Sequence, residues 1–478
     1  MIDEAEKSRT QFRELPMASL LSILAFLVLA CDQAPSGGEK AAIDAPPNLV
    51  LLVGDDQGYP DFGFMGNEIV RTPNLDRLAS EGTVFTQAHS TSNLGRPAHW
   101  TLLTGLYPHQ IHHVVQREAG VSAQTGRAGM HQWSRLSRGY TEAIRRDHNS
   151  LPRALARAGY VSFEGGKFWE ESHDVAGFSE GMTVATQGAG KKGRAFPAQA
   201  GGAGLKLGRE TLEPVFEFIK RHRDGPFFVW YTPSIPHVPH NPPARLRDLY
   251  KEDDLSKSAR LYYAECSWFD EGVGQLVDFL ERRGLRNDTL LVYLSDNGWQ
   301  QDPDADYGHF LGGPLGKLSL HEQAFRTPII FNWPGHIPAG EIREDLVSAV
   351  DLYATLLDYA GVEVAGDRPG RSLQGLLAGR SSEHRKHLIG STTFVRVEEK
   401  KLLRRVGGVW ARQNAFYVTT PDWHYVWNET LDTQVLFDRR RDPREERDLV
   451  AENPELARAF RERIEAWKVE IVRPFEED

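Results

Sequence analysis

Short apolar segments that alternate with amphipathic ones constrain the fold of this chain more than any other feature. Five apolar segments have the length of buried strands, and they span residues 48–53, 160–163, 227–231, 289–294 and 328–331. Residues 72–82 are typical of the amphipathic segments, because Thr72 is a natural helix N-cap, Pro73 suits the first turn and Gly82 suits the end. The alternation predicts an α/β fold with a large, mainly parallel sheet sandwiched by helices.

Polar residues closely follow four of the apolar segments. In chain order they are Asp55, Asp56, Lys167, His237, Asp296 and Asn297. Ligands of parallel sheets bind beyond the carboxyl ends of the strands. One Asp-Asp turn is common in any protein, so the prediction depends on two oxygen-rich clusters at corresponding strand ends. We expect these side chains to lie together at one edge of the sheet.

The residue types indicate a metal ion and an anion. Carboxylate and carboxamide oxygens, without cysteine or a necessary histidine, favour a hard cation, Ca²⁺ or alternatively Mg²⁺, over Zn²⁺. Lys167, His237 and Lys317, the last in the segment GKLSLHE, could supply positive charge to an anionic group bound against that metal. A single lysine is usually a solvated surface charge and a single histidine a packing residue, so the prediction depends on their occurrence together.

Longer segments carry a resemblance that covers most of the chain. They read PNLVLLVGDDQGYPDFGFMG, RTPNLDRLASEGTVFTQAHS, TLLTGLYPHQ, GGKFW, PHVPHNPP, YLSDNGW, LGKLSLHEQAFRTPIIFNWPG, VSAVDLYATLLDYAGV and VLFDRRRDPREERDLV. In these segments the chain resembles the sulfatase family of the alkaline phosphatase-like superfamily. The resemblance implies an alkaline phosphatase-like fold with a smaller C-terminal α+β subdomain, and the hydrolysis of sulfuric esters.

The resemblance also implies roles for single residues. The family holds Ca²⁺ with residues that match Asp55, Asp56, Asp296 and Asn297. Family lysines and a histidine that grip the sulfate match Lys167, His237 and Lys317. His99 stands in the place of a family arginine, and we add it as a substrate contact.

The position of the family's nucleophile departs from the family pattern. That nucleophile is a formylglycine made from the first residue of a Cys/Ser-x-Pro-x-Arg motif, which aligns here with Gly-Arg-Pro-Ala-His at residues 95–99. Gly95 therefore stands in the nucleophile's place, and Trp169 stands where many members have a histidine. Glycine cannot form a covalent intermediate. Ser92 is the one neighbouring hydroxyl that we would test as a replacement.

Three functions remain open for such a site. The first is a sulfuric-ester hydrolase with altered nucleophile chemistry, acting on a sulfated carbohydrate or a small sulfate ester. The second is a phosphoric-ester hydrolase that uses a metal-activated water. The third is a non-catalytic surface lipoprotein that binds sulfated glycans. Trp100, Trp133, Trp169 and Trp299 lie near the motifs and suit stacking on sugar rings, with core packing as the alternative.

The N-terminal region predicts export. Residues 20–30 are apolar, too few to span a bilayer of about 30 Å, and placed like the h-region of a signal peptide. They lead into Val28-Leu29-Ala30-Cys31, which resembles a bacterial lipobox, with an ordinary signal peptide or an uncleaved anchor as the alternative. With Met1 or Met17 as the start, we expect a periplasmic or cell-surface protein that is lipid-anchored at Cys31. The expected divisions are a signal peptide at 1–31, a tether at 32–46, a sulfatase-type domain at 47–365 and the C-terminal subdomain at 366–478.

Charge and cysteine content exclude other classes. The formal net charge of −10 is spread in mixed runs, which argues against nucleic acid as a partner and against a membrane contact other than the lipid anchor. Cys266 is the single cysteine that follows Cys31, so the mature chain has no intrachain disulfide. We expect Cys266 to be a small, buried apolar residue.

Overall fold

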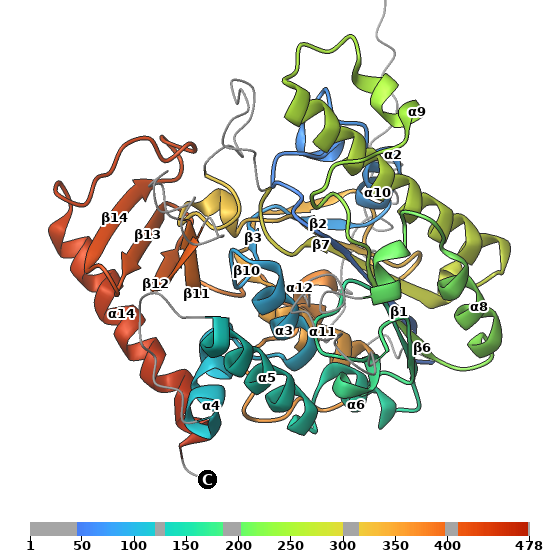
Figure 1. The fold of residues 1–478 in the computed structure, drawn as a ribbon, viewed down its shortest axis with the longest axis horizontal. Helices are drawn as coiled ribbons and strands as arrows, with labels where there is room; N and C mark the ends of the chain where they lie inside the picture. The colour runs from blue at the N-terminus through green and yellow to red at the C-terminus, as the bar shows by residue number, and fades with distance from the viewer. Residues whose placement is uncertain (1–44, 120–129, 185–201, 300–314, 397–409, 477–478) are drawn as a thin grey trace, which may run out of the picture. The chain divides into compact units, whose positions relative to one another are not determined.

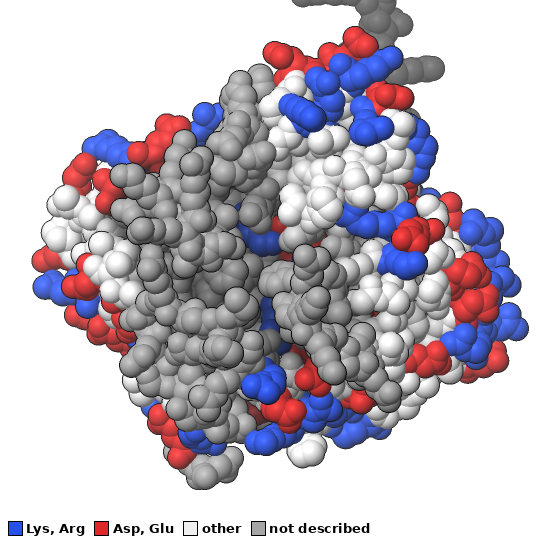
Figure 2. Space-filling view, in the orientation of Figure 1, with Lys and Arg blue, Asp and Glu red and all other residues white. Residues whose placement is uncertain are grey.

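The computed structural model describes residues 45–119, 130–184, 202–299, 315–396 and 410–476. Cys31 and the predicted signal peptide lie outside the described residues, as does most of the tether. Residues 46–478 form one compact unit. On the face shown in Figure 2, basic and acidic side chains are interspersed over the described part of this unit.

A large sheet of eight strands organises this unit (Figure 1). Its strands, in spatial order, are β5 (Glu180–Gly181), β4 (Val161–Gly166), β6 (Phe227–Thr232), β1 (Asn48–Gly54), β7 (Thr289–Ser295), β8 (Ile329–Asn332), β2 (Thr83–Phe85) and β9 (Glu341–Arg343). The pairs from β5 to β7 are parallel, and β8 is antiparallel to both of its neighbours. Every residue of β1, β6 and β7 is buried, so these strands read as continuous apolar runs.

Helices cover both faces of the sheet, as Figure 1 shows. One face carries α2 (Pro73–Ser80), α8 (Glu213–His222) and α10 (Lys257–Arg282), and the other carries α3 (Gly95–Thr104), α6 (Leu151–Ala156) and α11 (Val350–Tyr359). Within the described ranges, the other α-helices before the C-terminal region are α4 (Pro108–Ala119), α5 (Met130–Arg146), α9 (Ala244–Arg247) and α12 (Gln374–Leu377). A large apolar cluster of the described residues joins α2, α8 and α10 to the sheet. The predicted α/β fold class is therefore confirmed.

Helix α2 forms where it was predicted, but two of its boundary residues act differently. Thr72 occupies the N-cap position, yet its hydroxyl accepts a hydrogen bond from the Gly63 N–H at 3.0 Å and donates to Asp76 at 3.1 Å. Gly82 does not adopt the left-handed conformation that ends many helices. A Cβ atom at Gly82 would overlap the carbonyl oxygen of Phe331, so the glycine permits close approach of the chain to β8.

The C-terminal region adds a second layer. A four-stranded antiparallel sheet contains β11 (Leu388–Arg396), β12 (Trp410–Thr419), β13 (Trp423–Asn428) and β14 (Thr433–Asp438), and α14 (Pro454–Val472) packs on it. A short parallel pair, β3 (Ala88–His89) and β10 (Val347–Ser348), completes the strands. This arrangement confirms the expected α+β character of the C-terminal region. Among the described helices, none is both long enough and apolar enough to cross a membrane.

Cys266 lies in α10 and is fully buried. It packs in an apolar cluster with Tyr250, Tyr262 and Trp299. Burial raises the pKa of its thiol well above the ordinary value, so the sulfur stays protonated. Cys266 is therefore the inert packing residue that was expected.

Candidate functional site

The ends of β1 and β7 bring the four oxygen-bearing residues together. The two strands pair in parallel with Gly54 opposite Ser295, so the residues that follow them meet. The backbone N–H of Asp56 donates to Asp296 Oδ1 at 3.0 Å, and Asn297 Nδ2 donates to Asp56 Oδ1 at 2.7 Å. Asp56 has a φ of +71°, a conformation that aspartate tolerates better than most residues and that is common at functional sites.

Two buried lysines face the two aspartates that follow β1. Lys167 Nζ donates to both carboxylate oxygens of Asp55, at 2.8 and 2.7 Å. Lys317 Nζ donates to Asp56 Oδ1 at 2.5 Å. Both lysines are only 6% exposed. Each ammonium therefore has a carboxylate counter-charge, which offsets the cost of burying it.

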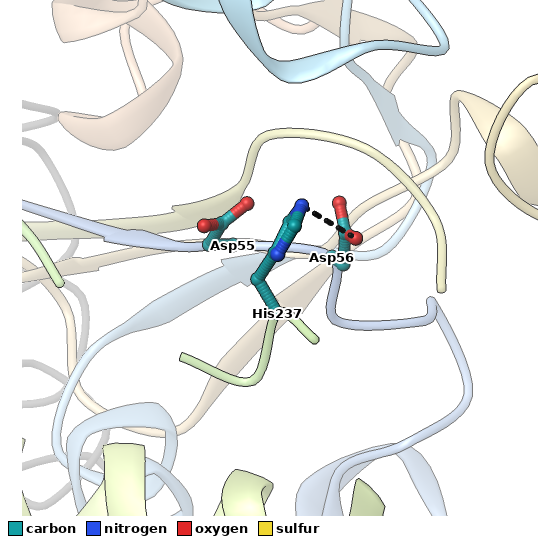
Figure 3. Close-up of side chains that lie close together, drawn as sticks. All are labelled: Asp55, Asp56 and His237. Carbon is teal, nitrogen blue, oxygen red and sulfur yellow. Dashed lines mark ion pairs between the residues drawn. The ribbon is translucent and has the colours of Figure 1, made fainter. Parts of the chain in front are cut away.

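His237 completes a cluster with the same two aspartates. Its Nε2, Asp55 and Asp56 supply ligand-type atoms that all lie within 4.8 Å of one another, and Figure 3 shows the imidazole between the two carboxylates. Nε2 is 3.7 Å from Asp56 Oδ2. Nδ1 lies 2.5 Å from the carbonyl oxygen of Val238, which can only accept a hydrogen bond, so the proton belongs on Nδ1.

Burial and charge shift the pKa values of the site in opposite directions. Burial alone would raise the pKa of Asp55, but Lys167 and its cationic neighbours hold it below the ordinary value. Burial, followed by repulsion from Asp55 and Asp56, raises the pKa of Asp296 well above its usual range. Burial, followed by repulsion from Lys167, lowers the pKa of His237. The site therefore favours a neutral imidazole and gains from any further cation beside Asp296.

Gly95 is the first residue of α3 and lies against Asp296. A Cβ atom at this position would overlap Asp296 Oδ2 and would lie 3.4 Å from Trp169. The absence of a side chain thus allows the Asp296 carboxylate to approach the start of the helix. Position 95 contributes backbone and space to the site, and no nucleophile.

His99 lies one turn into α3 and also faces Asp296. Its Nε2 is 3.7 Å from Asp296 Oδ2, and its ring packs edge-to-face against Trp169 and Trp230, with centroids 5.0 and 5.6 Å away. Burial lowers the pKa of His99 to about 3, so the imidazole is neutral at pH 7. Lys167 Nζ lies 4.9 Å from the centre of the Trp169 ring. Trp169 therefore links the cationic side of the site to the His99 side.

Comparisons with known proteins decide the family. A sequence model of the sulfatase family matches residues 47–362, and one described as N-sulphoglucosamine sulphohydrolase, C-terminal, matches residues 313–470. The chain belongs to the sulfatase family. Family members generally use a divalent metal ion, and the Asp-Asp-His cluster of this sulfatase-family chain is of the kind that holds one.

Individual relatives are distant but extensive. N-acetylgalactosamine-6-sulfatase of Rattus norvegicus is 28% identical over 380 residues, which are 73% of this chain and 67% of that protein. Arylsulfatase of Clostridium perfringens is 23% identical over 491 residues, or 90% and 94% of the two chains. The structure of BT4656 in complex with its substrate D-glucosamine-2-N,6-O-disulfate aligns with a TM-score of 0.63 at 19% identity, covering 90% of this chain and 98% of the other. At that identity the structural likeness shows the fold.

Buried oxygens without a hydrogen-bond partner indicate whether the site of this sulfatase-family chain fits a divalent ion. Within the described residues, Asp56 Oδ2, Asp296 Oδ2 and Asn297 Oδ1 are buried without a hydrogen-bond partner. An unpaired buried polar atom costs roughly 1–3 kcal/mol, whereas a cation would satisfy all three oxygens. Carboxylate and carboxamide oxygens are also the donors that hard cations prefer. The residues present therefore fit the ion.

The sequence also suggested a replacement nucleophile and sugar-stacking tryptophans, and the structure does not support these roles for the residues below. Ser92 is buried, and in the described part of the chain its hydroxyl has no hydrogen-bond partner that could take its proton, so nothing activates it. Trp100 stacks on Tyr140 and Trp299 stacks on Tyr262, with centroids 4.0 and 3.8 Å apart. Both tryptophans are buried, so the hypothesis that they stack on sugar rings is wrong. The side chain of Trp133 lies outside the described residues.

Sequence reasoning missed Glu170, three residues after Lys167. Its buried carboxylate accepts hydrogen bonds from Arg96 Nε at 2.9 Å, Trp100 Nε1 at 2.9 Å and the Thr141 hydroxyl at 2.6 Å. These bonds tie the first turns of α3 to the segment that carries Lys167. The signal available in the sequence was a carboxylate directly after the GGKFW motif.

Arg209 was missed as well. Its guanidinium donates to the carbonyl oxygens of Ser234 and His237, the latter at 3.0 Å, and pairs with the buried Glu265 at 3.4 Å. Asn241 closes the arrangement, because its backbone N–H donates to Glu265 at 2.8 Å. Arg209 therefore holds the loop on which His237 lies. No local sequence pattern marks an arginine whose partners are distant carbonyl groups.

Proposed function

We propose that this sulfatase-family protein binds the sulfate group of a sulfated carbohydrate or a small sulfate ester and hydrolyses the ester. Lys167, Lys317 and His237 surround the sulfate, with His99 at the side of Gly95. A divalent cation is held by the residues at the ends of β1 and β7, which are Asp55, Asp56, Asp296 and Asn297. Ca²⁺ is the ion that these oxygen ligands alone favour, with Mg²⁺ as the alternative.

One observation carries the proposal. Two buried ammonium groups, on Lys167 and Lys317, pair with the carboxylates that follow β1. Among the described residues, Oδ2 of Asp56 and Oδ2 of Asp296 are buried without a hydrogen-bond partner. A site of this kind gains from an anionic group and a cation that enter together, because each satisfies charges of the other sign. The rat relative is named for N-acetylgalactosamine, and the ligand of BT4656 is a disulfated glucosamine. Both names support a sulfated sugar as the ligand.

Gly95 determines what kind of hydrolysis is open to the chain. With no side chain at the start of α3, water supplies the new oxygen on sulfur, the bond from sulfur to the ester oxygen breaks, and the products are an alcohol and hydrogen sulfate. Lys167 and Lys317 neutralise charge on the sulfuryl oxygens as that bond breaks. The cation, when bound, supplies Lewis-acid polarisation of the same oxygens.

The same glycine favours a second candidate, a surface protein that binds sulfated glycans without turnover. Removal of a nucleophile leaves, in the serine hydrolase precedent, a residual acceleration of about 10³-fold over water. Binding alone would use the two lysines and the cation equally well. Phosphate esters are also tetrahedral anions, so a phosphoric-ester hydrolase enters as an arm of the same test.

The experiment is turnover of 4-methylumbelliferyl sulfate, its phosphate analogue and a panel of sulfated glycans by purified protein. We expect slow release of sulfate that Lys317→Ala and Asp296→Ala abolish, while Lys206→Ala, at an exposed lysine, matches wild type. Release of phosphate alone would assign the phosphoric-ester activity. Selective binding of sulfated ligands with no release of sulfate would make the chain a binding protein.

A further inference from the structure

Tyr262, a buried residue of α10, binds the loop that follows β1. Its hydroxyl accepts a hydrogen bond from the Gly58 N–H at 2.7 Å and donates one to Asp61 Oδ2 at 3.0 Å. Asp61 is buried as well. Gly58 stands two residues after Asp56, so this hydroxyl restrains the loop directly beyond the aspartates that follow β1.

The ring of the same tyrosine contacts the segment that follows β7. It stacks on Trp299, with ring centroids 3.8 Å apart and an interplanar angle of 4°. Trp299 stands two residues after Asn297, and its carbonyl oxygen accepts a hydrogen bond from the backbone N–H of Lys317 at 3.1 Å. One side chain of α10 therefore touches both segments that carry the oxygen-bearing residues, and it reaches the backbone of Lys317 through Trp299.

Asp61 holds the Tyr262 hydroxyl within a wider network of hydrogen bonds. The other carboxylate oxygen of Asp61, Oδ1, accepts from the Tyr263 hydroxyl at 3.1 Å, and its carbonyl oxygen accepts from Gln57 Nε2 at 3.0 Å. Burial raises the pKa of Asp61 to about 7, although the hydrogen bonds from the two tyrosines oppose this rise. A carboxylate is costly to bury, and a buried network that is fully bonded specifies one arrangement of its members.

We propose that Tyr262 is a positioning residue of the candidate site, which sets the distance between the loop after β1 and the segment after β7 through its hydroxyl and its ring. A divalent cation needs oxygen ligands from both segments at once, so its affinity depends on that distance. The hydroxyl is committed to Gly58 and Asp61, so Tyr262 acts through the backbone of these segments and is not itself a ligand. The inference rests on the cation site of the proposed function and adds a residue outside it.

Tyr263 provides a matched control at the next position of the helix. Its side chain is also buried, and its hydroxyl also donates to Asp61. Removal of either tyrosine hydroxyl therefore takes one hydrogen bond from Asp61. Removal of the Tyr262 hydroxyl also takes the acceptor of the Gly58 N–H, next to the cation ligands.

The experiment measures Ca²⁺ binding to the metal-free full chain by calorimetry, with thermal melting beside it. We expect Tyr262→Phe to weaken Ca²⁺ binding about tenfold, because the loop after β1 loses its restraint. Tyr263→Phe should lower the melting temperature by a similar amount and leave the Ca²⁺ affinity within about twofold of wild type. Amide hydrogen exchange at residues 57–61 should be faster in Tyr262→Phe than in Tyr263→Phe, because the Gly58 N–H loses its acceptor.

Two further variants make the test independent of one substitution. Tyr262→Leu also removes the stack on Trp299, so it should weaken Ca²⁺ binding more than Tyr262→Phe does, and the phenylalanine restores part of the affinity. Gly58→Ala leaves Tyr262 in place, but its Cβ would lie 2.5 Å from Asp61 Oδ2. This methyl group must displace Asp61 from the tyrosine hydroxyl, so Gly58→Ala should weaken Ca²⁺ binding too.

The outcomes separate this inference from the proposed function. Unchanged Ca²⁺ affinity in Tyr262→Phe, or an equal loss of affinity in Tyr263→Phe, overturns the role of Tyr262 and leaves the cation site standing. If thermal melting shows that Tyr262→Phe is not folded, unchanged Ca²⁺ affinity in Gly58→Ala overturns the role instead. Asp296→Ala tests the cation site itself, and a wild-type chain that binds neither Ca²⁺ nor Mg²⁺ overturns both proposals.

Discussion

Gly95 is the first residue of α3, and its missing side chain has a steric consequence for the site. Its missing Cβ is the space that Asp296 Oδ2 enters. The same carboxylate is buried, faces His99 and, in the described part of the chain, has no hydrogen-bond partner. Any side chain at position 95 must therefore displace the Asp296 carboxylate. The glycine is therefore part of the geometry of the site.

A prediction at this scale is that Gly95→Ala weakens cation binding and destabilises the fold. The methyl group must displace the Asp296 carboxylate, and overpacking of this kind costs about 1–3 kcal/mol. Calorimetry with the preferred divalent ion and thermal unfolding measure the two effects. Gly225→Ala is the control, because a Cβ there meets open space. Equal cation affinity in wild type and Gly95→Ala would show that Asp296 is not held as described.

At the scale of elements, the Glu170 carboxylate joins α3 to the segment after β4. The Glu170 side chain is 2% exposed and forms an ion pair with Arg96. Burial alone would raise the pKa of Glu170, but the charge of Arg96 and the hydrogen bonds from Arg96 and Thr141 lower it. The two elements carry His99 and Lys167, on opposite sides of the candidate site. The Glu170 carboxylate therefore helps to fix their relative position.

We predict that Glu170→Gln costs about 3 kcal/mol of stability and weakens binding of sulfated ligands, because removal of one partner leaves the other with a poorly compensated charge. Chemical denaturation and a binding titration measure the two effects. Glu171→Gln is the neighbouring control, since the Glu171 side chain is 53% exposed and pairs with Arg145 on the surface. A change of that surface pair should stay within about 0.5 kcal/mol. Similar effects of the two substitutions would contradict the role of Glu170.

The elements also show what the sequence could and could not predict. Strands β1, β6 and β7 were predictable because strands buried on both faces are continuously apolar. The residues after β1 and β7 followed from the rule that ligands bind at the carboxyl ends of parallel strands. The partners of Glu170 and Arg209 were not predictable, because they depend on loops and helices that meet only in the folded chain. Thr72 is a local example, because it was predicted to cap α2 but its hydroxyl accepts a hydrogen bond from the Gly63 N–H instead.

At the scale of the whole molecule, Glu322 connects the short sheet of β3 and β10 to the end of the C-terminal sheet. Its buried carboxylate accepts from Arg439 Nε at 2.9 Å, just after β14, and lies 3.1 Å from His89 Nε2 in β3. Arg326 is a third neighbour at 3.6 Å. Burial alone would raise the pKa of Glu322, but Arg326, His89 and Arg439 hold it well below its ordinary value. The C-terminal sheet is thus docked by a buried charge cluster.

Because the folded-state pKa of Glu322 is depressed, its contribution to stability is present above the unfolded pKa of about 4.3 and is lost as the pH falls toward the folded value. We predict that Glu322→Gln costs about 3–5 kcal/mol at pH 7, and that its difference from wild type narrows below about pH 4. Urea unfolding at a series of pH values measures this. Glu452→Gln, in an exposed pair with Arg447, is the control. A difference that does not depend on pH would contradict the assignment.

Both candidate functions, the hydrolase and the binding protein, require that Lys167 and Lys317 bind the sulfate group of an ester. The most direct measurement of this binding is calorimetric titration, with the divalent ion present, of a sulfated hexosamine and of the same sugar without sulfate. We expect binding of the sulfated sugar alone, with at least a tenfold loss of affinity in Lys317→Ala, since a charge-assisted hydrogen bond to the sulfate is removed. Equal affinity for the two sugars, or an unchanged affinity in Lys317→Ala, would contradict both candidate functions.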